Sequence, residues 1–384
     1  MPVERPKLIF LVTEDWYFWS HRLPMARAAR DCGFDVAVAT RVTAHGDAIR
    51  AAGFALHPLR WKRRAIGPMA SLAAIWEIAR LYRRERPLAV HHVSFKAAVL
   101  GGIAARLARV ALVVSMANGM GYIGASGDWR ARGLRRLARF VFPWTLFAGH
   151  GRVIVQNDAD RRALAALCPK QAARIVLIPG SGVDLAHFAP LPEPPAPPVT
   201  VAYAGRMIAI KGVATLVAAQ QRVRAQGIDL NLVLAGDTDD ENPSAIDRDT
   251  LARWAKQPGV AWLGRRDDIR TVWRDAHIAA LASLGGEGVP KSLLEAAAVG
   301  RPIVATDVPG MRTIAQPGVN AILVAPNDAA AFADALITLV RDADLRRCLA
   351  TAGRRLVEQG LSDTAIAEAT RQLYRTLLDE IAHA

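Results

Sequence analysis

The sequence predicts an α/β protein with two doubly wound, Rossmann-like domains, each a parallel sheet covered by helices. Short continuous apolar runs alternate with longer helical patterns along the whole chain. Such runs are typical of parallel strands that are buried on both faces. The alternation stops at residues 189–198, which contain six prolines, and then starts again. A stretch of this composition cannot form a helix or a central strand, so we expect a linker between two domains.

The expected strands fall into two groups on either side of this stretch. Those of the first domain are residues 7–13, 34–40, 55–59, 88–93, 111–116, 152–156 and 174–178. Those of the second domain are residues 199–203, 230–235, 260–263, 278–282, 302–305 and 321–324. We therefore expect one domain over residues 1–190, a linker over 191–198 and a second domain over 199–362. A last helix, residues 363–384, is expected to pack back on the first domain, and a ligand cleft between the domains should lie beyond the carboxyl ends of the strands.

The charge of the 384-residue chain is concentrated in its first half. Residues 1–190 contain 28 basic and 12 acidic residues, a net charge of +16, whereas the remainder contains 21 and 23, a net charge of −2. Arginine, whose planar fork binds phosphate in a bidentate manner, supplies 42 of the 49 basic residues. The three cysteines lie far apart with no Cys/His cluster, which excludes a disulfide framework and fits a reducing cytosol. We expect a soluble or peripheral protein, because no apolar segment is long enough for a membrane span. The arginine content makes phosphate-bearing partners the expected ones.

Two segments of the second half carry the residues of a candidate ligand site. Residues 283–302 read SLGGEGVPKSLLEAAAVGRP, in which we expect a helix to open at Pro290 and stop at Gly300. Glu287 and Glu295 are eight residues apart, about 80° around a helix, so both can accept hydrogen bonds from one ligand. The glycines before the helix leave backbone amides that suit a phosphate. The alternative is a capping glutamate and a solvated one.

The second segment follows the first strand of the second domain. It reads AGRMIAIKG and brings Arg206 and Lys211 to the carboxyl edge of that strand, where two cations can clamp a diphosphate. A pair of solvated loop residues is the alternative. The sequence Asp237-Thr-Asp239 resembles a metal-binding motif but stands in a run of acidic residues that indicates a solvated loop. We therefore expect neither a metal nor another cofactor to be required.

In combination, these motifs resemble the donor domain of the retaining family 4 glycosyltransferases, which have the GT-B fold. The pattern GR-x4-KG, a Gly-Asp pair, E-x7-E and GRPIVATDVPG carries the resemblance, together with PGSGVDLAHF at residues 179–188. Residues 14–22 and 90–96 resemble the subgroup that acts on polyprenyl-diphosphate-linked acceptors in O-antigen, capsule and N-glycan precursor assembly.

The resemblance implies a role for each motif residue. Arg206 and Lys211 would bind the diphosphate of a nucleotide sugar, Glu295 the ribose and Glu287 the transferred sugar, and Arg206, Lys211 and Glu287 would be the catalytic residues. The complete donor site implied in this way comprises Gly205, Arg206, Lys211, Gly236, Arg265, Glu287, Gly288, Val289, Pro290 and Glu295. Many family members have a histidine in the loop after the strand at residues 111–116, where this chain offers Asn118.

The first half contains candidates for acceptor and membrane binding. Polar residues after expected strands could position an acceptor, although each could also be an ordinary core or surface residue: Asp15, His21, His92, Lys96 and Asn118. Residues 129–147 predict an amphipathic helix with an apolar stripe that includes Leu137 and Ala138. Its candidate membrane contacts are Arg130, Arg132, Arg135, Arg136, Arg139 and Trp144. Arginine clusters at 60–64 and 80–86 favour the same interpretation, and a core-facing helix with a basic solvent face is the alternative.

The expected function is transfer of a sugar, with retention, from a nucleotide diphosphate to a polyprenyl-diphosphate-linked glycan. We expect a UDP-linked N-acetylhexosamine as donor, an anionic membrane as partner and a peripheral location on the cytoplasmic face of the plasma membrane. The alternatives are a GDP-mannose-dependent mannosyltransferase, a UDP-sugar epimerase of the same architecture and a basic nucleic-acid-binding protein. The last is disfavoured because the sequence contains no recognisable nucleic-acid-binding module.

Overall fold

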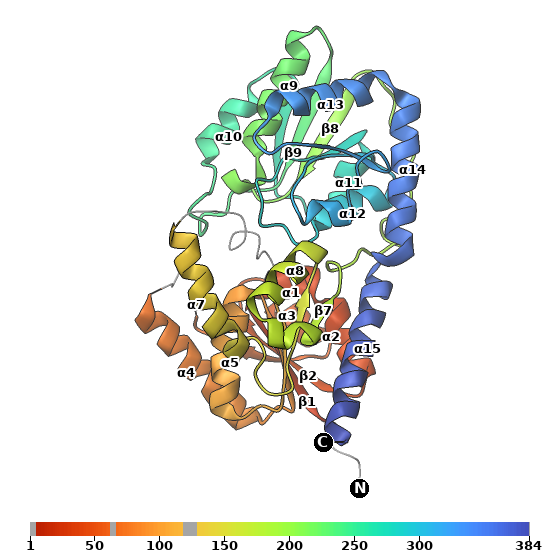
Figure 1. The fold of residues 1–384 in the computed structure, drawn as a ribbon. Helices are drawn as coiled ribbons and strands as arrows, with labels where there is room; N and C mark the ends of the chain where they lie inside the picture. Colours follow the sequence, from red (N-terminus) through yellow and green to blue (C-terminus); the bar gives the residue numbers. More distant parts are fainter. Residues whose placement is uncertain (1–4, 62–66, 118–128, 384) are drawn as a thin grey trace. The chain divides into compact units, whose positions relative to one another are not determined.

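The structure is a computed structural model that describes residues 5–61, 67–117 and 129–383, without the side chains of residues 129–135. The chain forms two compact units. The first contains residues up to Ser181 together with the C-terminal segment from Thr364, and the second contains Gly182–Asp363. Each unit has one parallel sheet with helices around it, which confirms the predicted α/β class (Figure 1).

The sheet of the first unit has seven strands in the order β3-β2-β1-β4-β5-β6-β7. Their bounds are β1 Lys7–Glu14, β2 Asp35–Arg41, β3 Ala55–Pro58, β4 Ala89–Val93, β5 Leu112–Met116, β6 Arg152–Val155 and β7 Ile175–Leu177. The order runs outward in both directions from β1 and β4. This reversal creates a switch point at the carboxyl ends of those two strands, which is where ligands bind in doubly wound sheets.

Helices cover both faces of this sheet because successive side chains of the buried strands point to opposite faces. On β1, Leu8, Phe10 and Val12 join a core with the helices α1, α2, α3 and α15. Ile9 and Leu11 join a separate core with α4 and α5. The helices of the unit are α1 Asp15–His21, α2 Leu23–Asp31, α3 Gly46–Ala51, α4 Pro68–Glu85, α5 Phe95–Ala108, α7 Trp129–Thr145, α8 Asp158–Leu167 and α15 Asp363–Ala382.

The C-terminal helix α15 completes the core of the first unit. Leu373, Tyr374 and Leu377 are buried in the core that lines one sheet face (Figure 1). The hydroxyl of Tyr374 is hydrogen-bonded to Nδ1 of His91 on β4 at 2.6 Å. Burial lowers the pKa of His91 well below its usual value, so this imidazole is neutral. Residues 283 positions apart in the sequence are thereby joined inside the first unit.

The second unit has a six-stranded parallel sheet in the order β10-β9-β8-β11-β12-β13. Its strands are β8 Val199–Ala204, β9 Leu230–Ala235, β10 Val260–Gly264, β11 Ile278–Leu281, β12 Ile303–Thr306 and β13 Ala321–Val324. Its helices are α9 Val213–Ala225, α10 Arg248–Ala255, α11 Ile269–Arg274, α12 Lys291–Ala298, α13 Ala329–Arg341 and α14 Ala343–Gly360. The chain reverses direction across the sheet between β8 and β11, so their carboxyl ends form the switch point of this unit.

The boundary between the units lies earlier than the predicted linker. It falls between Ser181 and Gly182, and the proline-rich stretch belongs to the second unit. Arg301 explains the difference: its buried guanidinium donates to the backbone oxygens of Leu191 at 3.2 Å and Pro192 at 2.8 Å. Arg346 adds an ion pair to Glu193 at 2.6 Å. The proline-rich stretch is therefore attached to the second unit by two arginines and is not a free spacer.

Across the part of the chain that the structure describes, no helix combines the length and apolar character that a bilayer crossing requires.

We predict that Tyr374→Phe destabilises the first unit. The change leaves the ring in place but removes the hydroxyl partner of buried His91, so the free energy of unfolding should fall by about 1–3 kcal/mol. Urea denaturation followed by circular dichroism measures the change. Thr376→Val on the exposed side of the same helix is the matched control and should have little effect. Equal stability of Tyr374→Phe and the control would contradict the structural role of this hydrogen bond.

Candidate functional site

In the second unit, the loop after β8 places Arg206 at the carboxyl edge of the sheet. Tyr203 lies beneath the loop and its hydroxyl donates a 2.7 Å hydrogen bond to the backbone oxygen of Arg206. The guanidinium of Arg206 forms an ion pair with Asp239 at 2.8 Å and remains partly exposed. Asp239 and Tyr203 were not predicted as site residues. Tyr203 is an apolar strand position in the sequence, and only the loop geometry shows that it supports Arg206.

Lys211 and Glu287 come together from two loops that follow neighbouring strands. The Nζ atom of Lys211 lies 2.6 and 2.8 Å from the two carboxylate oxygens of Glu287. Ser283 donates a further hydrogen bond to Glu287 Oε1 at 2.7 Å. The side chain of Lys211 is 20% exposed and that of Glu287 is 8% exposed, so the pair is largely shielded from water. Both predicted catalytic residues of this pair therefore lie at the switch point of the second sheet.

A glycine of the GRPIVATDVPG motif holds the Glu287 loop in place. A Cβ atom on Gly310 would lie 2.2 Å from the backbone oxygens of both Glu287 and Gly288, closer than any side chain can approach. Gly310 follows β12, which pairs with β11. The absence of a side chain at this position allows the loop after β12 to contact the loop after β11. The motif thus positions the backbone that carries Glu287.

Helix α12 has the predicted limits and carries Glu295 into the interior. The helix starts after Pro290, and Gly300 follows it in a left-handed conformation with φ of 83°. Glu295 is 8% exposed. Burial raises the pKa of its carboxyl to about 7, and the Lys291 ammonium 3.9 Å away opposes that shift. Glu295 is therefore partly protonated at neutral pH while no ligand is bound.

The remaining predicted donor residues follow strands of the same sheet at its carboxyl edge. Gly236 follows β9 and its oxygen accepts a hydrogen bond from the indole of Trp262 at 2.9 Å. Arg265 follows β10 and is exposed beside Asp267. Gly205, Gly288, Val289 and Pro290 lie in the two loops already described. Asp237 and Asp239 of the DxD sequence pair with Arg248 and Arg206, and the described residues hold no group of three potential metal ligands.

In the first unit, Asp15 has a structural role. Its buried carboxylate accepts the Thr43 hydroxyl at 2.6 Å and the amides of Thr43, Ala44 and His45 at 2.7–2.8 Å. Burial alone would raise the pKa of this carboxyl, but the hydroxyl and the amides outweigh burial and lower the pKa to about 2. Asp15 therefore anchors the loop after β2. This geometry disfavours the predicted contact with an acceptor hydroxyl.

The other acceptor candidates have different surroundings. His21 stacks on Tyr17 with ring centroids 4.4 Å apart. His92 is fully buried against Tyr82, and burial lowers its pKa to about 3, so it is a neutral core residue. Lys96 lies in the first turn of α5, where burial lowers its pKa and Glu14 opposes that shift. Asn118 lies outside the described residues. Of the three described candidates, His21, His92 and Lys96, the last has the environment best suited to contact an anionic acceptor.

Glu14 was missed as a candidate although it ends β1 at the switch point of the first sheet. It is 5% exposed and pairs with Arg41, the last residue of β2, at 3.5 Å. The same carboxylate supports the charge of Lys96. Its position at the end of the first strand was available from the sequence. Glu14, Arg41 and Lys96 form a charged group at the carboxyl edge of the first sheet.

Helix α7 is amphipathic, but one predicted position on its apolar stripe is wrong. Ala138 is buried as expected, whereas Leu137 is 58% exposed. Phe140 and Trp144 are exposed as well, at 80% and 48%, and Phe142 turns inward instead. Arg136 and Arg139 share the exposed side, and the side chains of Arg130, Arg132 and Arg135 lie outside the description. The exposed face of α7 is therefore both basic and aromatic.

The group in the second unit can bind an anion beside a polyhydroxylated ligand. Arg206 and Lys211 offer two cations from the loop after β8, and Glu287 and Glu295 offer two acceptors for hydroxyl groups. Lys211 lies against Glu287, so it can screen that carboxylate from a bound phosphate. Such fixed charges stabilise negative charge that develops on a leaving group, without reorganisation during the reaction.

Two family models match the chain in consecutive regions. "Glycosyl transferase 4-like" matches residues 7–141 and "Glycosyl transferases group 1" matches residues 198–342. The chain is 26% identical over 294 residues to the UDP-Gal:alpha-D-GlcNAc-diphosphoundecaprenol alpha-1,3-galactosyltransferase of Escherichia coli, which covers 73% of each chain. It is 22% identical over 332 residues to the capsular polysaccharide biosynthesis glycosyltransferase CapM of Staphylococcus aureus, covering 83% of this chain and 84% of CapM.

The fold is similar to that of solved structures over nearly the whole chain. The crystal structure of Anabaena HepE in complex with UDP-glucose matches with a TM-score of 0.75 and 17% sequence identity, covering 97% of this chain and 100% of HepE. With the two parallel α/β sheets, this similarity confirms the GT-B fold that the motifs implied.

We predict that Glu295→Gln changes the pH dependence of stability in the unliganded protein. The folded-state pKa of about 7 lies above the usual value of 4.5, so the buried carboxyl releases its proton less readily than in the unfolded chain. Relative to the variant, wild-type protein should lose stability as pH rises from about 5 to 8, by up to about 3 kcal/mol. Urea unfolding at several pH values measures the difference.

The comparison isolates Glu295 because other groups are unchanged. Asp160, whose pKa burial raises to about 6, titrates in the same window but is present in both proteins. A constant difference between wild type and variant from pH 5 to 8 would contradict the buried state of Glu295.

Proposed function

The chain belongs to the group 1, family 4 glycosyltransferases, which are retaining enzymes, and from that premise we propose that it transfers a sugar from a UDP-linked donor to a polyprenyl-diphosphate-linked glycan. The proposed donor sugar is an N-acetylhexosamine, and the proposed setting is the synthesis of a cell-surface polysaccharide. The Escherichia coli relative is named for a UDP-galactose donor and a diphosphoundecaprenol-linked acceptor, which supports the UDP carrier and the lipid-linked acceptor, and CapM supports the setting.

The observation that carries the proposal is the contact between Lys211 and Glu287 at the switch point of the second sheet. It brings a cation for phosphate within 2.6 Å of a carboxylate that can accept hydrogen bonds from a sugar. A nucleotide sugar needs these two kinds of group side by side, because its diphosphate is bonded directly to the anomeric carbon. A site for a free sugar would not need the cations, and a site for a free nucleotide would not need Glu287.

We propose the following roles during transfer. Arg206 exchanges its partner Asp239 for a phosphate oxygen of the donor, while Lys211 binds the diphosphate and keeps its contact with Glu287. The acceptor oxygen bonds to the anomeric carbon on the face from which the nucleoside diphosphate leaves, and the hydroxyl proton passes to the leaving diphosphate. The anomeric configuration is thereby preserved. Negative charge that accumulates on the leaving diphosphate is stabilised by the two cations and the amino end of α12.

In this proposal Glu295 binds the ribose of the donor. Ribose hydroxyl groups can donate hydrogen bonds to both oxygens of the ionised carboxylate, which would favour the charged form. The raised pKa of about 7 in the unliganded protein limits repulsion between Glu295 and the incoming diphosphate. Donor binding then shifts Glu295 toward the ionised state, because the ligand provides the partners that burial otherwise removes.

The first unit is proposed to bind the lipid-linked acceptor at an anionic membrane surface. Lys96, supported by Glu14 and Arg41, can bind an acceptor phosphate at the carboxyl edge of the first sheet. The exposed basic and aromatic face of α7 suits the headgroup region of a bilayer, because arginine and tryptophan both favour that environment. The proposed location is the cytoplasmic face of the plasma membrane.

We predict that Arg206→Ala and Lys211→Ala each lower kcat by about 10²–10³-fold. Each change removes one cation that would stabilise the leaving diphosphate, and loss of a single such group typically has an effect of that size. Initial rates of sugar transfer to a lipid-diphosphate-linked glycan measure the effect. Arg253→Ala, at an exposed position on α10 of the same unit, is the matched control and should retain full activity. Full activity of either site variant would show that the donor site lies elsewhere.

A screen of nucleotide sugars identifies the donor. At a concentration of 100 times its Kd, a ligand stabilises the folded protein by about 2.7 kcal/mol, which should raise the melting temperature by about 5–10 °C. We expect this rise with UDP-N-acetylhexosamines, and not with GDP-, ADP- or dTDP-sugars. A larger rise with GDP-mannose would instead assign a mannosyltransferase. Conversion of the UDP-sugar alone into its epimer would assign an epimerase and refute transfer.

A further inference from the structure

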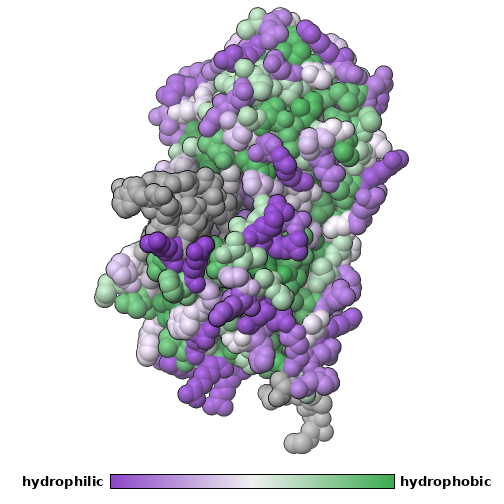
Figure 2. Space-filling model, viewed as in Figure 1, coloured by the Kyte–Doolittle hydropathy of each residue, from purple (hydrophilic) through white to green (hydrophobic). Residues whose placement is uncertain are grey.

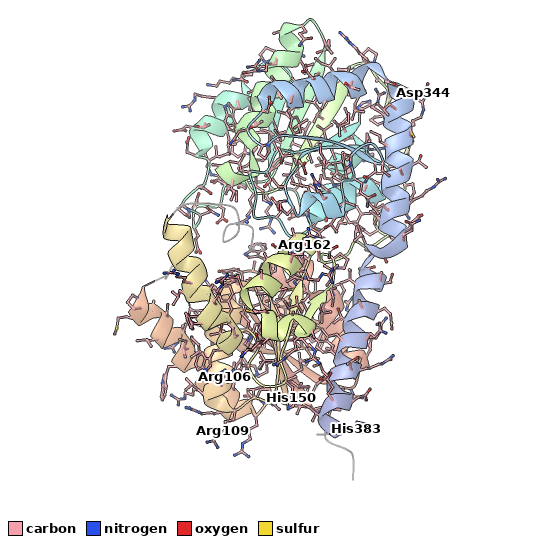
Figure 3. All side chains as sticks on the ribbon, in the orientation of Figure 1. Arg106, Arg109, His150, Arg162, Asp344 and His383 are labelled. Carbon is pink, nitrogen blue, oxygen red and sulfur yellow. The ribbon has the colours of Figure 1, made fainter. Side chains whose placement is uncertain are left out.

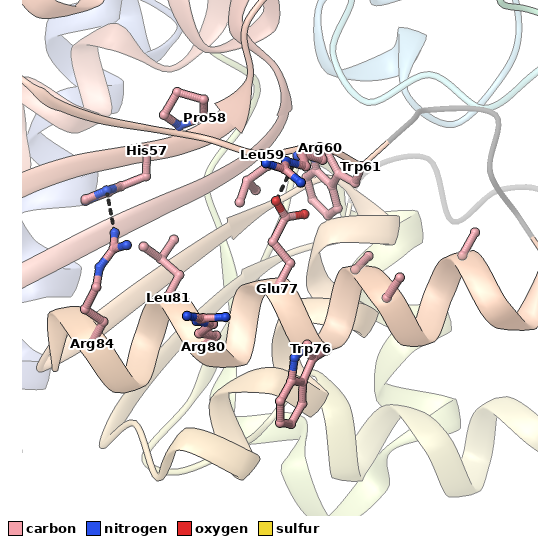
Figure 4. A pocket seen from close by; sticks show the side chains of 13 residues that line it. His57, Pro58, Leu59, Arg60, Trp61, Trp76, Glu77, Arg80, Leu81 and Arg84 are labelled. Carbon is pink, nitrogen blue, oxygen red and sulfur yellow. Dashed lines mark hydrogen bonds between the residues drawn. The ribbon is translucent and has the colours of Figure 1, made fainter.

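A pocket in the first unit lies apart from the residues of the proposed reaction. It opens between residues 57–61, at the end of β3, and helix α4, and its volume is about 790 Å³ (Figure 4). Pockets of this size hold small organic molecules. Three alanines of α4, Ala70, Ala73 and Ala74, line the pocket, and larger side chains at these positions would reduce its volume. The pocket is a feature of the edge strand, not of the switch point.

The lining of the pocket is apolar at its base and basic at its mouth. Leu59 and Trp61 are buried, whereas the guanidinium groups of Arg60, Arg80 and Arg84 are on exposed side chains. Glu77 contributes the one carboxylate of the described lining, and it accepts the backbone amide of Arg60 at 3.0 Å (Figure 4). The site therefore offers a net positive mouth above an apolar base. This combination fits an amphiphile whose anionic group lies at the surface.

A buried donor in the lining also lacks a partner. Trp61 is 6% exposed, and among the described residues its indole N–H has no hydrogen-bond acceptor. Buried polar groups in proteins nearly always have a partner. An ester or phosphate oxygen of a ligand in the pocket would be a suitable acceptor. This is a second observation, independent of the charge at the mouth, that favours an oxygen-rich ligand.

The surface around the pocket is rich in exposed apolar side chains. On α4, Met69, Leu72 and Trp76 are 78%, 61% and 63% exposed. The three helices α4, α5 and α7 together carry seven of the twelve exposed large hydrophobic side chains of the described chain. Figure 2 shows hydrophobic and hydrophilic residues mixed over this side of the first unit. A water-soluble face of a monomer does not need such a concentration of exposed apolar groups.

Two arginines join these helices into one surface. Arg83 of α4 lies over the Trp76 ring at 6.0 Å and donates to the backbone oxygen of Leu107, near the end of α5, at 3.1 Å. Arg106 of α5, labelled in Figure 3, lies over the Trp144 ring of α7 at 5.1 Å. The two helices approach closely because a Cβ atom on Gly102 would be 2.0 Å from the backbone oxygen of Thr145. The result is a continuous belt of arginine and tryptophan, the pair of residues that favours a membrane interface.

We propose that the pocket between β3 and α4 binds an anionic phospholipid of the bilayer, with the phosphate at Arg60, Arg80 and Arg84 and the start of an acyl chain against the alanines. Met69, Leu72 and Trp76 then enter the headgroup region beside it. The inference specifies how the protein contacts the membrane in the proposed function, and it rests on that proposed function. It adds a defined lipid site to a surface that would otherwise bind by charge alone.

Filling the pocket is the decisive test. The double variant Ala70→Leu/Ala73→Leu keeps the charge and adds apolar area, so it should weaken binding to vesicles only if a lipid occupies the pocket. We expect at least about five-fold weaker binding to phosphatidylcholine vesicles that contain about 30% phosphatidylglycerol, measured by co-sedimentation. If the protein binds vesicles through its exposed surface and not through the pocket, the double variant should bind them as tightly as wild type or more tightly. That result would overturn the proposal.

Charge variants and a soluble headgroup complete the experiment. Arg80→Gln should weaken binding to the anionic vesicles about five-fold and leave the weak binding to pure phosphatidylcholine unchanged. Ala330→Leu and Arg341→Gln on α13 of the second unit are the matched controls and should bind like wild type. Equal loss for Arg341→Gln would overturn the proposal. Stabilisation of the protein by millimolar glycerol phosphate, together with vesicle binding that is the same for wild type and the pocket variants, would show that the site takes a soluble phosphate ester and would overturn the lipid site.

Failure of this inference and failure of the proposed function give different results. The lipid site alone would be overturned if UDP-sugars still stabilise the protein and the pocket variants bind vesicles like wild type. Loss of any response to nucleotide sugars, with vesicle binding that depends on the pocket, would overturn the proposed transfer reaction alone. Circular dichroism of each variant establishes that it is folded before either comparison.

Discussion

The ion pair between Lys211 and Glu287 fixes the geometry of the proposed donor site. It joins the loops after β8 and β11, which are neighbouring strands of the second sheet. Each partner needs the other, because a carboxylate with 8% of its exposure would be an uncompensated buried charge without the ammonium. The pair also solves an electrostatic problem, since a carboxylate close to a diphosphate would otherwise repel it. The lysine can contact both groups and reduce that repulsion.

The backbone around this pair is held as firmly as the side chains. The amide of Leu284 donates to the backbone oxygen of Ile210 at 2.8 Å, which ties the two loops together directly. Gly310 brings the loop after β12 against the carbonyls of Glu287 and Gly288. Three loops from adjacent strands therefore constrain one another. A parallel sheet makes this possible because the loops that follow its strands all lie at the same edge.

The strands were predictable within a residue or so because parallel strands buried on both faces are continuous apolar runs. The end of α12 was predictable because Gly300 has the left-handed conformation that such ends favour. The role of Asp15 was not predictable, because the amides that it binds lie 28–30 positions away in the sequence. The unit boundary was also missed, since only the folded chain shows that Arg301 attaches the proline-rich stretch. Local patterns predict elements, whereas such errors arise from contacts between distant residues.

The arginine content has two physical explanations, and only one involves a ligand. In the second unit, Arg301 is 2% exposed and Arg346 is 5% exposed, and both donate to several backbone oxygens that a lysine could not reach together. In the first unit, Arg83 and Arg106 lie over indole rings at the surface, where a planar guanidinium stacks better than an ammonium. A preference for arginine over lysine is thus explained in part by backbone tethers and is not by itself evidence of phosphate partners. The informative arginines are those whose guanidinium is exposed beside an apolar surface, and the described ones on α4, α5 and α7 meet that condition.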